Sequence, residues 1–137
     1  MTAKKIALGL LLAAAASLAQ AETPQALLAG YAAEAARTAP GFTPSAQRGR
    51  EFFQRKWGVS QTMPSCAACH TPIPAAEGKH SITGKRIAPL SPAANPERFT
   101  RLDKAEKWFR RNCNDVAGRD CSAAEKADFI QFLLPGA

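Results

Sequence analysis

The residues best suited to chemistry are two cysteines and a histidine in the run Cys66-Ala67-Ala68-Cys69-His70. A Cys-x-x-Cys-His run is the attachment signature of c-type haem. Two thiols at this spacing reach the two vinyl groups of the macrocycle, and the histidine that follows supplies a nitrogen to the iron. The motif therefore predicts one covalent haem c, attached through Cys66 and Cys69, with His70 as an axial ligand.

Two other chemistries use a Cys-x-x-Cys pair. A thioredoxin-like dithiol requires a βαβ setting, which the helical pattern of this chain does not offer. A four-ligand zinc site would need Cys113 and Cys121 as thiolates. The N-terminal export signal described below would direct the chain to an oxidising compartment, where cysteines are kept as disulfides rather than thiolates. Both alternatives are weaker than the haem interpretation.

The ligand on the other face of the haem is not settled by the motif. Methionine is the usual sixth ligand of electron carriers, but beyond residue 21 the chain has only Met63, three residues before Cys66, where it cannot easily reach the opposite face. His80 is the conventional alternative, although its polar loop favours a solvated histidine. An empty face, a lysine and a less usual donor also remain open.

A helix expected from Asp103 to about Cys113 offers one such donor. Its apolar stripe consists of Leu102, Ala105, Phe109 and Cys113. At 100° per residue, Asn112 falls on the edge of this stripe, whereas Asn114 points toward solvent. A buried amide needs a partner, so Asn112 is either an iron ligand or a helix-ending asparagine bonded to backbone.

The remaining pattern predicts an all-α fold. Helices are expected over Pro24–Thr38, from Pro44-Ser45 through Phe53 to Trp57, briefly over Glu97–Arg101, and from the capping box Ser122/Glu125 to the stop at Pro135-Gly136. The connection over residues 58–95 carries prolines at 64, 72, 74, 89 and 92, too many for a continuous helix. So long a connection usually wraps something, here the haem.

The N-terminus reads as an export signal. Lys4 and Lys5 precede an apolar run that ends in Ala19-Gln20-Ala21, which predicts a signal peptide over residues 1–21 with cleavage after Ala21, a single domain over 22–137, and a periplasmic location. The mature part has no second apolar span. It would carry 16 basic and 11 acidic side chains, because two of the 18 Lys and Arg precede residue 22. This modest charge and export make nucleic-acid binding improbable.

Further segments resemble class I cytochromes c, and specifically the sphaeroides haem protein family of oxygen-binding cytochromes. Gly49-x-x-x-Phe53 and the aromatic final helix are similar to the helix crossing of class I. The closer likeness lies in residues 107–121, continuing to 128, and in residues 26–31, 64–70, 84–85, 87–90 and 96–100. It implies a class I fold around one haem, with an extra N-terminal helix.

In that family an asparagine is the sixth ligand and leaves when a diatomic molecule binds, and the matching residue is Asn112. The resemblance also implies a disulfide between Cys113 and Cys121, and a Pro89 carbonyl that accepts the second N–H of His70. Trp108 is either a donor to a haem propionate or a core residue.

The expected function is that of a redox-active cytochrome that binds O₂, NO or CO. Basic residues near the haem edge suggest docking with an acidic redox partner, or simply a solvated face: Lys85, Arg86, Lys104, Lys107, Arg110 and Arg111. The resemblance implies a dihaem cytochrome c or a membrane cytochrome b as electron donor. The alternatives are a low-spin carrier with His80 as ligand, an enzyme acting on NO or peroxide, and a gas sensor.

Overall fold

The periodic segments fold as helices in the computed structural model, which describes residues 22–135. In chain order these residues form α1 (Pro24–Thr38), α2 (Ala46–Gln54), α3 (Cys66–His70), β1 (Gly78–Lys79), β2 (Arg86–Ile87), α4 (Leu102–Ala117) and α5 (Ala123–Leu133). The all-α prediction is confirmed. The expected signal peptide lies outside the described residues. Within them, no helix is both long and apolar enough to cross a membrane.

Side-chain caps start three of the helices where the sequence indicated. The Thr23 hydroxyl accepts the Ala26 N–H of α1 at 3.1 Å. Ser45 does the same for α2. At α5 the expected capping box is complete, because Ser122 accepts the Glu125 N–H at 3.2 Å while the Glu125 carboxylate accepts the Ser122 N–H at 2.9 Å. These bonds satisfy N–H groups that have no partner inside a helix.

The structure corrects two expected helix ends, one expected helix and the expected lack of structure in the long connection. The second helix ends at Gln54, before Trp57, and residues 97–101 form a turn rather than a helix. The helix expected to stop near Cys113 continues to Ala117, where Gly118 ends it in the left-handed conformation at φ 70°. The long connection contains α3 and a two-residue antiparallel hairpin, in which Gly78 pairs with Ile87.

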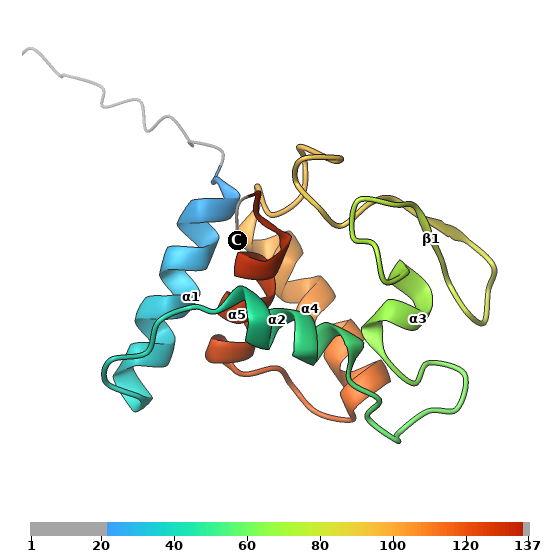
Figure 1. The fold of residues 1–137 in the computed structure, drawn as a ribbon, viewed down its shortest axis with the longest axis horizontal. Coiled ribbons are helices and arrows are strands. Elements are labelled where there is room, and N and C mark those ends of the chain that lie inside the picture. Colours follow the sequence, from blue (N-terminus) through green and yellow to red (C-terminus); the bar gives the residue numbers. More distant parts are fainter. Residues whose placement is uncertain (1–21, 136–137) are drawn as a thin grey trace, which may run out of the picture.

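The core lies where α1, α2 and α5 meet (Figure 1). Helices α2 and α5 cross at Gly49, where an added Cβ would overlap the backbone carbonyl of Asp128. The expected crossing at this glycine is therefore confirmed. Phe53 and Ile130 beside it are fully buried. Helix α1, the extra N-terminal helix, packs on the other side of α5.

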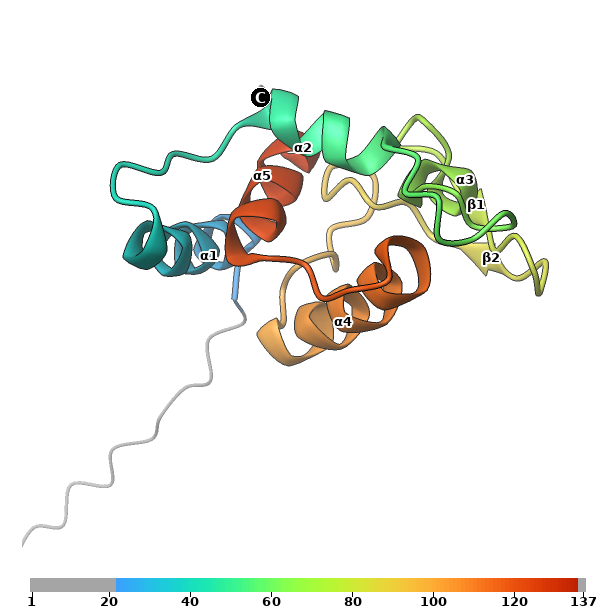
Figure 2. The same cartoon turned by 90° about the horizontal axis from the view of Figure 1, so that it is seen from below.

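Helix α4 stands apart from this layer (Figure 2). Its buried face differs from the expected stripe, because Val116 is buried with Ala105, Phe109 and Cys113 whereas Leu102 is 45% exposed. Long side chains connect α4 to the rest of the fold. The Phe109 ring lies edge-on to Tyr31 and Phe129, with centroids 5.8 and 5.9 Å apart.

Candidate cofactor site

A cavity of about 660 Å³ lies between α4 and the wall formed by α3 and the hairpin. Six of the sequence-predicted site residues line it, from helices α3 and α4: Cys66, Cys69, His70, Trp108, Asn112 and Cys113. Ligand cavities are typically ~300–1,000 Å³, so this one has room for a large planar group. The geometry therefore brings together most of the site that the sequence predicted.

Helix α3 presents one thiol and the imidazole in uncharged form. Burial, assisted by the charge of Arg98, lowers the pKa of His70 to about 4. Burial also raises the pKa of the Cys66 thiol to about 11. The Cys69 sulfur lies 3.0 Å from the Ser81 hydroxyl. At neutral pH His70 is thus a neutral imidazole, the form that binds a metal.

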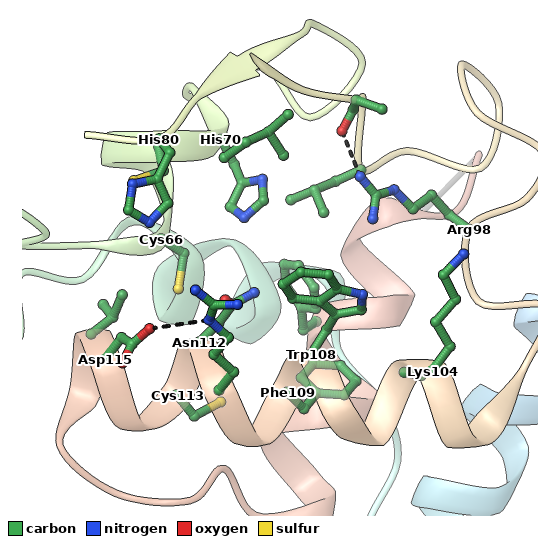
Figure 3. A pocket seen from close by; sticks show the side chains of 18 of the residues that line it. Cys66, His70, His80, Arg98, Lys104, Trp108, Phe109, Asn112, Cys113 and Asp115 are labelled. Atoms are coloured by element: carbon green, nitrogen blue, oxygen red, sulfur yellow. Dashed lines mark hydrogen bonds and ion pairs between the residues drawn. The ribbon is translucent and has the colours of Figure 1, made fainter. Parts of the chain in front are cut away.

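Asn112 faces the same cavity from α4, on the side opposite His70 (Figure 3). It lies inside the helix, which continues to Ala117, and its side-chain amide makes no hydrogen bond among residues 22–135. The backbone-bonded asparagine is instead Asn114, which donates to the Arg110 carbonyl at 2.8 Å and to Asp120 at 2.7 Å. The backbone-bonded interpretation of Asn112 is therefore wrong.

His80 is not the freely solvated histidine that its loop suggested. It is half-buried and lines the cavity, and its Nδ1 accepts the backbone N–H groups of Ile82 at 3.2 Å and Thr83 at 3.1 Å. Figure 3 shows His80 on the same side of the cavity as His70, facing α4. Met63 also lines the cavity, from the segment that leads into α3.

The Pro89 carbonyl already has two partners. It accepts Arg98 Nε at 2.8 Å and Asn95 Nδ2 at 3.3 Å, and Arg98 also donates to the Ala88 carbonyl at 2.7 Å. A carbonyl oxygen has two lone pairs, so a bond from His70 would have to displace one of these donors. The role that the resemblance implied for Pro89 stays a prediction without support from this geometry.

The tryptophans differ from expectation in opposite ways. Trp108 is 40% exposed at the cavity, so it is not a core residue, and its donation to a haem propionate stays a prediction. Trp57, given no chemical role from the sequence, lines the cavity, and its Nε1 is the one buried side-chain polar atom without a partner in the described part of the chain. The only sign of this role in the sequence is that Trp57 is an aromatic residue within a polar segment.

The unpaired Trp57 Nε1–H indicates what kind of group the cavity can hold. A buried N–H without an acceptor costs about 1–3 kcal/mol, and an occupant that carries an acceptor would remove that cost. The cavity also offers aromatic walls, two thiols and a neutral imidazole. These residues fit a haem. Cys113 and Cys121 form a disulfide with each other, as the resemblance implied, and so cannot ligate zinc.

Comparison with known proteins also supports a haem as the cofactor. Residues 40–133 match the family described as Domain of unknown function (DUF1924). The chain is 46% identical over 118 residues to the cytochrome c-type protein SHP of Cereibacter sphaeroides, covering 85% of this chain and 87% of that protein. It is 50% identical over 92 residues to cytochrome c'' of Methylophilus methylotrophus, covering 66% of this chain and 64% of that relative.

Solved structures of the same two proteins share the fold. Oxidised SHP, described as an oxygen-binding cytochrome c, superposes with a TM-score of 0.72 at 46% identity over 82% of this chain and 96% of that one. Oxidised cytochrome c'' gives 0.75 at 43% identity, over 82% and 93%. A solution structure of cytochrome c'', described in terms of haem-ligand detachment, gives 0.70 at 42% identity, over 82% and 92%.

Proposed function

The chain belongs to the family of c-type cytochromes that includes SHP and cytochrome c'', and carries haem c; from this premise we propose that it is a periplasmic, redox-active monohaem cytochrome in which Asn112 yields its place to a small diatomic ligand. The observation that carries the proposal is the cavity with His70 on one side and an amide without hydrogen bonds on the other.

Different cavity residues would bind different parts of the haem. Cys66 and Cys69 would attach the haem through thioether bonds, and His70 would hold its iron from the α3 side. The Asn112 amide oxygen would be the weaker donor to the iron from the α4 side. When bound, the haem supplies an iron that exchanges one electron and coordinates O₂, NO or CO.

An amide is a neutral, weak donor, which makes the Asn112 position labile. Because no hydrogen bond among the described residues holds the amide in place, the side chain is free to rotate away and let a diatomic ligand enter. Once displaced, its N–H can donate to that ligand. A ligand-binding cytochrome follows from this lability, whereas a strong sixth donor would favour electron transfer alone.

The alternative low-spin carrier requires His80 on the α4 side of the cavity. Its position beside His70 and its Nδ1 bonds to the hairpin backbone count against that role. On the α4 side the described cavity lining pairs Arg111 with Asp115 at 3.8 Å but offers no histidine to carry protons to or from peroxide, so we keep ligand binding and electron transfer ahead of an enzymatic function.

Electron transfer requires a partner at the cavity mouth. Of the basic residues singled out from the sequence, Lys85, Arg86, Lys104 and Arg111 line the cavity, and Arg98 and Arg101 join them, whereas Lys107 and Arg110 do not. Arg86 is paired with Glu77. The rim remains positive and suits an acidic redox partner, for which a dihaem cytochrome c or membrane cytochrome b is our candidate.

The test is a set of visible spectra of the holoprotein, oxidised, reduced and with CO. The wild type should be high spin, and Asn112→Ala should bind CO several-fold faster because no side chain has to leave. Asn112→His should convert the protein to low spin and suppress CO binding.

Two matched variants serve as controls. Asn114→Ala, on the exposed face of the same helix, and His80→Ala should leave spin state and CO rate unchanged. The proposal fails if His80→Ala turns a low-spin protein high spin while Asn112→Ala alters neither spectrum nor rate. A low-spin spectrum that Met63→Ala converts to high spin would transfer the ligand role to Met63.

A further inference from the structure

Arg111 lies next to Asn112 on α4 and lines the same cavity. Its guanidinium is weakly engaged. The nearest carboxylate is Asp115, with Nε and Oδ2 3.8 Å apart, and the two side chains are 60% and 45% exposed. Within residues 22–135 the Arg111 side chain donates no hydrogen bond. Exposed pairs at such distances contribute little, so the donors of Arg111 are free for another acceptor.

The other arginines of the cavity are committed. Arg98 donates to two backbone carbonyls, Arg86 pairs with Glu77 through two bonds of 2.6 and 2.5 Å, and Arg101 pairs with Asp103. Of the lining arginines, Arg111 alone keeps its fork of N–H donors unused in the described part of the chain. Arg111 is therefore the cavity arginine best able to bind a ligand that enters the cavity.

The guanidinium is nevertheless held in place. The Arg111 Cζ atom lies 5.7 Å from the centroid of the Trp108 ring, whose π electrons attract the cation. Asp115 lies one turn further along the helix. Figure 3 shows Trp108, Asn112 and Asp115 along the same face of α4, with the dashed line to Asp115 marking the ion pair. The indole and the carboxylate thus hold a positive charge beside Asn112 without using up its donors.

We propose that Arg111 makes the position vacated by Asn112 selective for small anions, such as azide or nitrite, over neutral diatomic ligands. The inference rests on the proposed function, because the anion needs Asn112 to leave. A guanidinium offers paired donors and a permanent charge to an anion, whereas a neutral ligand gains little from either. Lys104, one turn before Trp108, adds a second cation, and Asp115 opposes both.

The experiment compares an anion with a neutral ligand in the same variants. Azide is titrated into the oxidised holoprotein and CO into the reduced one, followed by visible absorption. Arg111→Gln should raise the azide Kd on the order of tenfold, as the loss of one positive charge that lines the same cavity implies, and leave CO affinity within about twofold. Arg111→Lys should restore part of the azide affinity, because it keeps the charge but not the fork.

Arg110→Gln is the matched control, since it removes the same charge from the neighbouring residue, which does not line the cavity. It should change the azide Kd by less than about twofold. The inference is overturned if Arg111→Gln shifts azide and CO alike, or neither, or no more than Arg110→Gln does. If Asn112→Ala behaves as predicted, such a result overturns the role of Arg111 alone; if Asn112→Ala changes nothing, the proposed function fails first.

Discussion

Gly49 decides how closely the two central helices approach. The residue is buried, and a Cβ at this position would overlap the Asp128 carbonyl and come within 2.9 Å of Phe132 Cβ. Because backbone cannot move aside cheaply, Gly49→Ala should force α2 and α5 apart and lower the free energy of unfolding by about 1–3 kcal/mol or more. Urea denaturation of the holoprotein, followed by circular dichroism, measures the change.

Gly30 provides the matched comparison, because it is also helical but exposed, and an added Cβ would meet nothing within 4 Å. Gly30→Ala should raise the free energy of unfolding by about 0.5–1 kcal/mol through the better helix propensity of alanine. Equal effects of the two substitutions would contradict the close helix crossing at Gly49.

At the scale of an element, the end of α4 depends on a cross-link. Cys113 lies in α4 and Cys121 in the segment before α5, eight positions apart, and both are buried. Closing a loop of this length stabilises a protein by roughly 2.5 kcal/mol in the chain-entropy model. The double variant Cys113→Ser/Cys121→Ser should lose about that much in urea denaturation, since its unfolded chain is freer.

Treatment with a reductant is the second arm of this experiment. It should lower the stability of the wild type toward that of the double variant and leave the double variant unchanged. Thiol labelling of the denatured, unreduced holoprotein should find no free cysteine at these positions. Two labelled cysteines there would show that the bridge does not form.

The helices were largely predictable from the sequence, but the connections were not. The span of α1 and the capping box at Ser122 were correct to the residue because local bonds set them. The end of α4 was placed too early, since Gly118 and the disulfide fix it rather than the apolar period. The hairpin escaped prediction because a two-residue strand has no period, and packing of Gly78 against α3 positions it.

The same distinction holds for the candidate site. The helical period placed Asn112 on the edge of the apolar stripe and Asn114 toward solvent, and in the structure Asn112 is half-buried at the cavity whereas Asn114 is exposed. The partners of the Pro89 carbonyl and the orphaned Trp57 donor were missed, because they depend on which segments tertiary folding brings together. A pattern within one element can be read from the sequence, whereas a contact between two loops cannot.

At the scale of the whole molecule, three helices are tied by one polar group. Glu106 on α4 accepts the Tyr31 hydroxyl of α1 at 2.6 Å and the Lys126 ammonium of α5 at 2.9 Å. The ammonium also lies 5.2 Å from the Tyr31 ring centroid. Because α4 stands apart from the core layer, this link and the Phe109 contacts fix the position of α4, which forms the wall of the cavity opposite α3.

This link predicts how the molecule responds to acid. Burial raises the pKa of the Glu106 carboxyl, but the hydrogen bonds from Tyr31 and Lys126 outweigh it and leave the pKa below its ordinary value of 4.5. A carboxyl with a depressed folded-state pKa contributes stability above its unfolded pKa, and that stability is lost as the pH falls through the folded value. Stability should therefore decline below about pH 4.5 as Glu106 becomes protonated.

Glu106→Gln removes the titrating group and keeps its size. At pH 7 the variant should be less stable than the wild type by about 1 kcal/mol, and the difference should shrink as the pH falls below 4.5, because the wild type then loses the same charge. Protonation of His70 affects both proteins and cancels in the comparison. Glu34→Gln, exposed on α1, should follow the wild type at every pH. If the gap between Glu106→Gln and the wild type stays constant from pH 7 to 3, the carboxylate does not bind the three helices by its charge, and packing around Phe109 alone positions α4.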